Sequence, residues 1–259
     1  MIHIKNEQEI VLIKKACQIV TLTHEYIKDF IKVGISTEEI NNLAHDFIIK
    51  NSATPAFLGY HDYPKSVCIS VNDVVVHGIP NKKKILKDKD IVSVDIGVNY
   101  QGYYGDAAWT YPVGDINQGD CKLLEVTKSS LYAGIMAVKP GNRVSDISKA
   151  IENYVVKNGF SVVEEFSGHG IGKNLHEDPN IPNFYRNDLG PLLKPGMILC
   201  IEPMVNAGKK GVKILSDNWT AVTVDRKRSA HFEHQVLVTD DGYEILTVHK
   251  GEHVCLEKT

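Results

Sequence analysis

The chain has 259 residues, of which 43% are hydrophobic and 24% are charged, and this composition excludes disordered, collagen-like and coiled-coil proteins. Its 29 basic and 32 acidic residues give a net charge of −3, which argues against a dedicated nucleic-acid-binding protein because such proteins carry a basic surplus. The sequence shows no membrane-spanning apolar run, no signal peptide and no CxxC pair, so we expect a cytoplasmic protein with five free thiols, Cys17, Cys68, Cys121, Cys200 and Cys255.

Two helices are predicted at the start of the chain. An Asn-x-x-Glu pattern at residues 6–9 favours a helix start, and apolar residues then follow at helical spacing to about residue 34. A Ser-x-x-Glu pattern at residues 36–39 favours a second helix, which we expect to end near residue 51.

Strands are predicted to follow. Residues 66–79 are rich in Val and Ile and end in a Gly-Ile-Pro turn, and residues 91–98 are typical of a buried strand. Residues 100–113 are interpreted as its hairpin partner. The buried strand has one ionisable residue, Asp95, and a hairpin would bring Asp106 back beside it.

The pattern then begins again, with a helix predicted over residues 121–138 and another over residues 145–158. We therefore predict a single domain, residues 1–259, built from two pseudo-symmetric halves at about 1–115 and 116–250. One alternative is that the halves only share helix and strand patterning. A single offset of 107 residues argues against it, because it pairs Gly34 with Gly141, Asn51 with Asn158, and Asp95 with Glu202.

Isolated carboxylates in apolar segments indicate metal chemistry. Glu202 lies in the apolar run 197–204, and Glu233 lies in the run 231–238, which is predicted to form another strand. With Asp95 and Asp106, four such carboxylates are costly to bury without a shared cation. Imidazole ligands would move the preference from Mg or Ca toward Mn, Fe, Co or Zn. Singly a histidine is more often structural, but three lie beside glycines or at segment ends, namely His77, His169 and His176.

Rival motifs are not satisfied. The run Gly168-x-Gly170-x-Gly172 is followed by Lys173 rather than the pattern of a dinucleotide site, and no GK[ST] or GxSxG motif is present. The pair His176-Glu177 lacks the second histidine of HExxH and meets Pro179 within one turn.

The sequence closely resembles type I methionine aminopeptidase, nearly from end to end. Besides the four carboxylates and His169, the resemblance is carried by residues 59–68, 76–80, 168–172 and 201–208. It implies an α+β chain with the pita-bread (creatinase/aminopeptidase) fold, in which two pseudo-symmetric αβ halves surround a central antiparallel sheet. The 107-residue offset indicates two halves independently.

The resemblance also implies the roles of the metal ligands. Asp95 would bind one divalent ion, His169 and Glu202 would hold the other, and Asp106 and Glu233 would bridge the two. The ions would be Co, Mn, Fe or Zn, and a metal-bound water would be the nucleophile.

Three residues are implied as catalytic: Glu202 as proton shuttle, His176 as a donor to the developing oxyanion, and His77 beside the scissile amide. The implied substrate pocket is lined by Tyr60, Tyr63, Cys68, His77, Leu175, His176 and Trp219. For several of these, simple core packing is an open alternative.

The implied function is removal of the initiator methionine from nascent proteins whose second residue is small. The expected partners are nascent N-termini, with transient ribosome contact, no nucleic acid, no membrane and a monomeric state. A prolidase or aminopeptidase P is an alternative, but those relatives usually carry an extra N-terminal domain for which 259 residues leave no room. A non-catalytic protein of the same fold is the other alternative, and the five retained ligand positions oppose it.

Some positions depart from what the family commonly shows, and none of them removes an implied ligand. They leave turnover and side-chain preference open, because residues around a metal site tune it by about 10-fold to 100-fold. These positions are Phe57, Ala107, Leu175, His231 and Gln235.

Overall fold

Helices and strands of the first half appear in the expected order in a computed structural model, which describes residues 1–249. They are α1 (Glu7–Lys28), α2 (Thr37–Lys50), β1 (Thr54–Pro55), the 3-10 turn η1 (Tyr60–Asp62), β2 (Cys68–Val71), β3 (Val74–Val76), β4 (Ile91–Tyr100) and β5 (Tyr103–Pro112). The predicted strand at 66–79 is two strands, because the chain turns between them at Asn72, whose φ is 59°.

Elements of the second half repeat this order and then add strands. They are α3 (Gln118–Met136), α4 (Val144–Lys157), β6 (Ser161–Val162), β7 (Ser167–Gly170), β8 (Glu177–Pro182), β9 (Ile198–Ile201), β10 (Met204–Asn206), β11 (Val212–Ile214), β12 (Ala221–Thr223), β13 (Ser229–His231), β14 (His234–Val238) and β15 (Tyr243–Ile245).

Both predicted capping boxes are present. The Asn6 side chain accepts the Glu9 amide at 3.0 Å and the Glu9 carboxylate accepts the Asn6 amide at 2.9 Å, and Ser36 caps α2 in the same way. The first helix ends at Lys28 rather than near residue 34. It ends early because the chain turns toward Leu86, whose carbonyl accepts the Gly34 amide at 2.9 Å.

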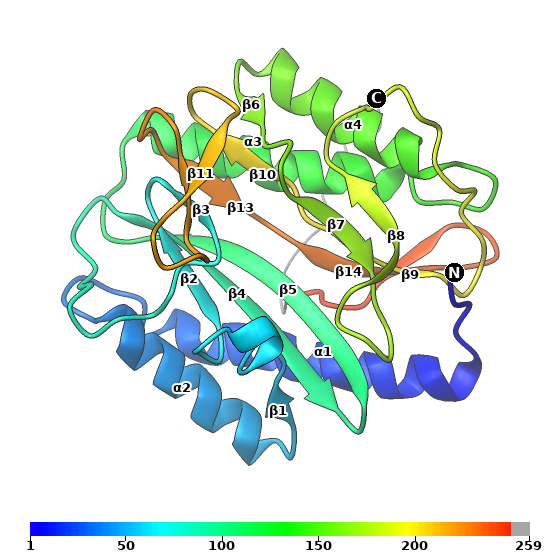
Figure 1. The fold of residues 1–259 in the computed structure, drawn as a ribbon, viewed down its shortest axis with the longest axis horizontal. Coiled ribbons are helices and arrows are strands. Elements are labelled where there is room, and N and C mark those ends of the chain that lie inside the picture. Colours follow the sequence, from blue (N-terminus) through cyan, green and yellow to red (C-terminus); the bar gives the residue numbers. More distant parts are fainter. Residues whose placement is uncertain (250–259) are drawn as a thin grey trace.

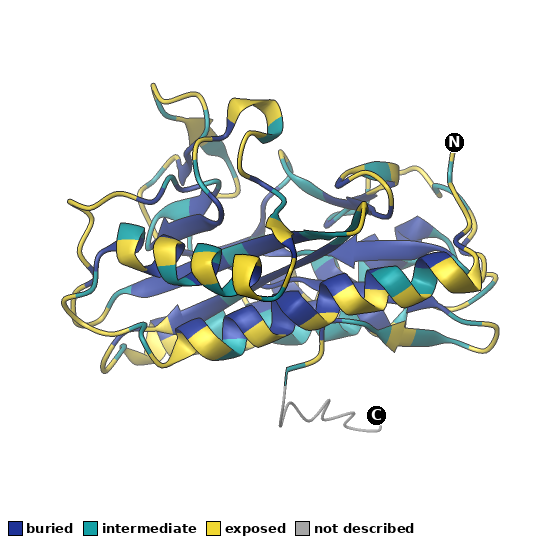
Figure 2. Cartoon of the chain, turned by 90° about the horizontal axis from the view of Figure 1, so that it is seen from below, coloured by how far each residue is buried: buried dark blue, intermediate teal, exposed yellow. Residues whose placement is uncertain are grey.

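The strands form antiparallel sheets between two pairs of helices (Figure 1), with α1 and α2 on one side and α3 and α4 on the other. The larger sheets contain β4 and β5 with β1 and β2, and the strands β15-β14-β9-β7-β8. A hydrogen bond from the Glu233 amide to the Ala108 carbonyl, 2.8 Å long, joins them. Figure 2 shows buried and exposed residues alternating along α1 and α2, as expected for helices that cover a sheet.

The 107-residue offset holds in three dimensions. It carries the bounds of α2 onto those of α4, and it carries the pairing of Thr54 with Asn99 onto the pairing of Ser161 with Asn206. These repeats form the two αβ halves of the expected fold, and each half has its own large buried apolar cluster. The division into one catalytic domain stays a prediction.

Two further expectations concern thiols and membranes. Cys17, Cys68, Cys121 and Cys200 are free thiols, and Cys255 lies outside the described residues. Within residues 1–249, no helix is both long enough and apolar enough to cross a membrane.

Candidate metal centre and active-site cavity

The β4–β5 hairpin brings Asp95 and Asp106 together as expected. Asp95 pairs with Ala108, and Asp106 pairs with Gly97. Because paired residues of an antiparallel ladder lie on one face, and 106 and 108 are two residues apart, both carboxylates project from the same face as diagonal neighbours.

The other two carboxylates lie in breaks between strands. Ile201 pairs with His234, and Met204 pairs with His231, so Glu202 and Glu233 occupy two-residue breaks that face each other. The prediction of one strand over 231–238 is therefore wrong, and the apolar run 197–204 is likewise divided between β9 and β10. At these breaks both segments leave the five-stranded sheet and enter the sheet of β13, β10 and β6, and Pro203 has no amide for a continued ladder.

Potential ligand atoms converge in two overlapping groups. In each group, every residue offers one oxygen, nitrogen or sulfur atom, and these atoms all lie within 4.8 Å of one another. The first group consists of Asp106, His169, Cys200 and Glu233, and the second of Glu202, His231 and Glu233. Asp95 lines the same cavity, outside both groups. The structure thus gathers four of the five ligand positions implied by the resemblance into these groups, places Asp95 in the same cavity, and adds Cys200 and His231 to the groups.

The electrostatics of the cluster favour a cation. Burial, followed by the charge of neighbouring carboxylates, raises the pKa values of Asp106, Glu202 and Glu233 well above their usual range, and burial raises that of Asp95 to about 6. Buried carboxylate oxygens of Asp95, Asp106 and Glu233 have no hydrogen-bond partner. No Lys or Arg is among the described residues that line the cavity. This donor set fits divalent metal ions.

The histidines present neutral rings to the cluster. The His169 Nδ1 donates to the Gly170 carbonyl at 2.9 Å, which leaves its Nε2 facing Glu202 Oε1 at 3.4 Å. Burial lowers the pKa of His169 to about 3 and that of His77 to about 4. His176 bonds the Tyr60 hydroxyl at 2.7 Å. Neutral imidazoles are the form that binds metals.

A cavity of about 340 Å³ joins the cluster to an apolar wall, and every residue implied as catalytic, metal-binding or substrate-binding lines it. The Tyr63 ring meets Trp219 edge-on, with 5.1 Å between centroids, and its hydroxyl donates to the Gly78 carbonyl at 3.0 Å. These contacts fix the wall. The cavity is also lined by Phe57 and His231, noted above as departures, and by His61, Val76, Glu165, Phe166, Ser167 and Met204, which the sequence interpretation missed.

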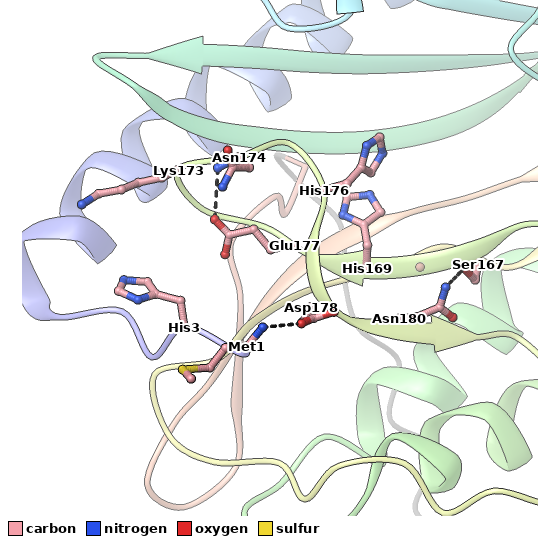
Figure 3. Close-up of a pocket in the computed structure, with 11 residues that line it drawn as sticks. Met1, His3, Ser167, His169, Lys173, Asn174, His176, Glu177, Asp178 and Asn180 are labelled. Atoms are coloured by element: carbon pink, nitrogen blue, oxygen red, sulfur yellow. Dashed lines mark hydrogen bonds and ion pairs between the residues drawn. The ribbon is translucent and has the colours of Figure 1, made fainter. Parts of the chain in front are cut away.

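A second cavity, of about 730 Å³, lies beyond His169 and His176, which line both cavities. Figure 3 shows it between the N-terminal segment and the loop that precedes β8. The N-terminal amine of Met1 pairs there with Asp178 at 2.6 Å.

Comparisons with known proteins agree with this geometry. A curated methionine aminopeptidase 1 of Bacillus subtilis is 55% identical over 247 residues, which cover 95% of this chain and 99% of that protein. The crystal structure of methionine aminopeptidase from Rickettsia prowazekii matches with a TM-score of 0.94 at 42% identity, covering 96% and 100% of the two chains.

The fold extends beyond those enzymes. A prolidase from Pyrococcus furiosus has the same fold with a TM-score of 0.77 at 24% identity, and the match covers 95% of this chain but only 66% of the prolidase. The pita-bread fold is thus confirmed. Residues 11–240 match the sequence profile of metallopeptidase family M24. The chain therefore belongs to metallopeptidase family M24, whose hydrolases depend on divalent metal ions.

Proposed function

We propose that this chain is a methionine aminopeptidase that releases the initiator methionine from nascent polypeptides with a small second residue. The observation that carries the proposal is the cavity in which a carboxylate and imidazole cluster adjoins an apolar wall. Its volume of about 340 Å³ suits one side chain and a scissile bond rather than a long peptide.

The cluster would hold two divalent ions, whose identity among Co, Mn, Fe and Zn is open. We assign Asp95 to one ion, His169 and Glu202 to the other, and Asp106 and Glu233 to both. When bound, the ions supply the positive charge that activates water and polarises the scissile carbonyl. Opposing halves of the chain contribute these ligands, which fixes their relative positions.

Residues of the protein would complete the reaction. Glu202, whose buried carboxylate has a raised pKa, takes a proton from the attacking water and passes it to the leaving amine. His176 donates a hydrogen bond to the developing oxyanion, and its ring is held by Tyr60. His77 contacts the scissile amide.

The apolar wall would select the substrate. Tyr63, Cys68, Leu175 and Trp219 would surround the methionine side chain, with Tyr60 beside its backbone. Tyr63, Cys68 and Leu175 are buried, so the wall is rigid and excludes water from the bond to be cleaved.

The test uses apo protein, the peptide Met-Ala-Ser, graded Mn, Co, Fe or Zn, and Asp106→Ala as control. We expect metal-dependent release of methionine by the wild-type protein and none by the variant. No metal-dependent release, or equal release by both proteins, would overturn the proposal. We further propose that residues 1–259 act as one monomeric cytoplasmic domain whose partners are nascent N-termini, with transient ribosome contact.

A further inference from the structure

His231 is a buried imidazole at the cluster with no hydrogen bond at Nε2. The residue is 2% exposed and lines the active-site cavity, and its Nε2 atom has no hydrogen-bond partner. A buried ring nitrogen without a partner is costly, because it has lost water and gained nothing in exchange. Such an atom calls for a ligand.

Two other buried histidines show what a structural role looks like in this protein. His24 bonds the Tyr111 hydroxyl at 2.9 Å and the Ala107 carbonyl at 3.0 Å. His234 bonds the Thr247 hydroxyl at 2.9 Å and the Tyr132 hydroxyl at 3.2 Å. Both ring nitrogens of each are therefore satisfied within the protein, and His231 differs from them at Nε2.

The Glu202 carboxylate lies too far from His231 for a hydrogen bond and at a suitable distance for an ion that both groups bind. His231 Nε2 lies 3.5 Å from Glu202 Oε2, whereas hydrogen bonds of this type measure about 2.7 to 3.2 Å. Two donors bound to one ion at about 2.0 to 2.2 Å lie about 3.0 to 3.6 Å apart. His169 Nε2 faces the other oxygen, Glu202 Oε1, at a similar 3.4 Å.

The backbone of His231 is held in place before any ion binds. The His231 amide donates to the Thr110 hydroxyl at 3.0 Å, and that hydroxyl donates to the His231 carbonyl at 2.7 Å. Ser93 holds the Thr110 hydroxyl at 2.8 Å. His231 is thus attached to the β4–β5 hairpin that carries Asp95 and Asp106, as a preorganised ligand should be.

We propose that His231 is an additional metal ligand, which binds through Nε2 to the ion held by Glu202. This rests on the metal centre assigned under the proposed function, and it gives that ion two imidazole ligands, His169 and His231. A second nitrogen donor should raise the preference for Co, Fe or Zn over Mn, because imidazole suits the former and oxygen donors suit Mn.

The test measures the binding of Co(II) and Mn(II) to apo protein. Calorimetry gives the affinity for each ion, and visible absorption reports the coordination of cobalt. The proteins are wild type, His231→Gln, His231→Ala and His45→Gln. The last is a control in α2, whose ring bonds the Ser66 hydroxyl at 2.8 Å and does not line the active-site cavity. We expect His231→Gln to bind Co(II) at least about tenfold more weakly, with a smaller loss for Mn(II) and a changed cobalt spectrum. Free imidazole should restore the spectrum of His231→Ala.

The outcomes separate the ligand from its surroundings. An unchanged cobalt spectrum in both His231 variants overturns the proposal, even if the affinity falls, because His231 then acts outside the coordination sphere. If wild-type protein binds no Co(II), the metal centre itself fails. Circular dichroism identifies a misfolded variant, and in that case the cobalt spectrum of the other His231 variant, changed or unchanged, decides.

Discussion

Lys5 should hold the loop that carries Leu175 and His176. Its Nζ lies 2.8 Å from Glu177 Oε2, and the two side chains are 2% and 11% exposed. The Lys5 amide also donates to the Gly196 carbonyl at 2.9 Å. The N-terminal segment is therefore fastened beside the active-site cavity, on the side drawn in Figure 3.

Replacement of Lys5 by Met keeps the apolar stem and removes the charge. The Glu177 carboxylate would keep one bond, from the Asn174 amide at 3.0 Å. In the wild-type protein burial raises the pKa of Glu177, but its bonds to Lys5 and Asn174 lower it below the usual value overall. Loss of one partner from a buried pair costs about 3 to 5 kcal/mol. We expect about 3 kcal/mol, because one bond remains.

A double-mutant cycle measures this coupling. Lys5→Met, Glu177→Gln and the double variant are unfolded in urea at pH 7, and the same cycle is run on the exposed pair Lys14–Glu244, whose side chains are 43% and 46% exposed. We expect about 2 to 3 kcal/mol of coupling for the buried pair and at most about 1 kcal/mol for the exposed one. Equal coupling in both cycles would refute this reasoning. A fall in kcat for Lys5→Met alone would show that the loop positions His176.

Three further predictions concern packing, pH and the N-terminus. Gly105→Ala should lose about 3 kcal/mol of stability, because a Cβ there would lie 2.6 Å from backbone atoms of α1, and an unchanged Tm would contradict this. Burial lowers the pKa of His24 to about 4 from its usual 6.5, so only the unfolded state takes up its proton between those values. The free energy of unfolding should therefore fall by about 3 kcal/mol as the pH drops from 6.5 to 4. Urea unfolding of His24→Gln over the same pH range should not show this contribution to the decrease. Ile2 is too bulky for removal of the preceding residue by the proposed specificity, so an intact mass should include Met1, and a mass lacking it would count against that specificity.

The sequence was sufficient for features that depend on local patterns. The capping boxes at Asn6 and Ser36 are local, and so is the hairpin that joins Asp95 to Asp106. The offset that pairs Asp95 with Glu202 predicted the second half, because related sequences fold alike.

Features that depend on contacts between strands distant in the sequence could not be predicted in this way. An apolar run such as residues 197–204 has the same pattern whether the strand is continuous or is broken at Glu202. Cys200 lies two residues before Glu202, and His231 lies two residues before Glu233. Residues two apart in a strand lie on the same face, so this spacing indicated that Cys200 and His231 could accompany the two glutamates. Only the facing breaks between strands show that both side chains reach the cluster.

The position of the metal centre makes stability and activity depend on the same groups. Asp95 and Asp106 belong to the first half, while His169, Glu202 and Glu233 belong to the second, so an ion bound among them joins the halves. Without an ion, burial opposes the ionised form of all four carboxylates, and repulsion between carboxylates opposes it further at Asp106, Glu202 and Glu233. Binding of an ion to the folded chain removes that repulsion and adds stability by mass action. On the proposed assignment, the site that polarises a peptide bond therefore also holds together the two halves that build it.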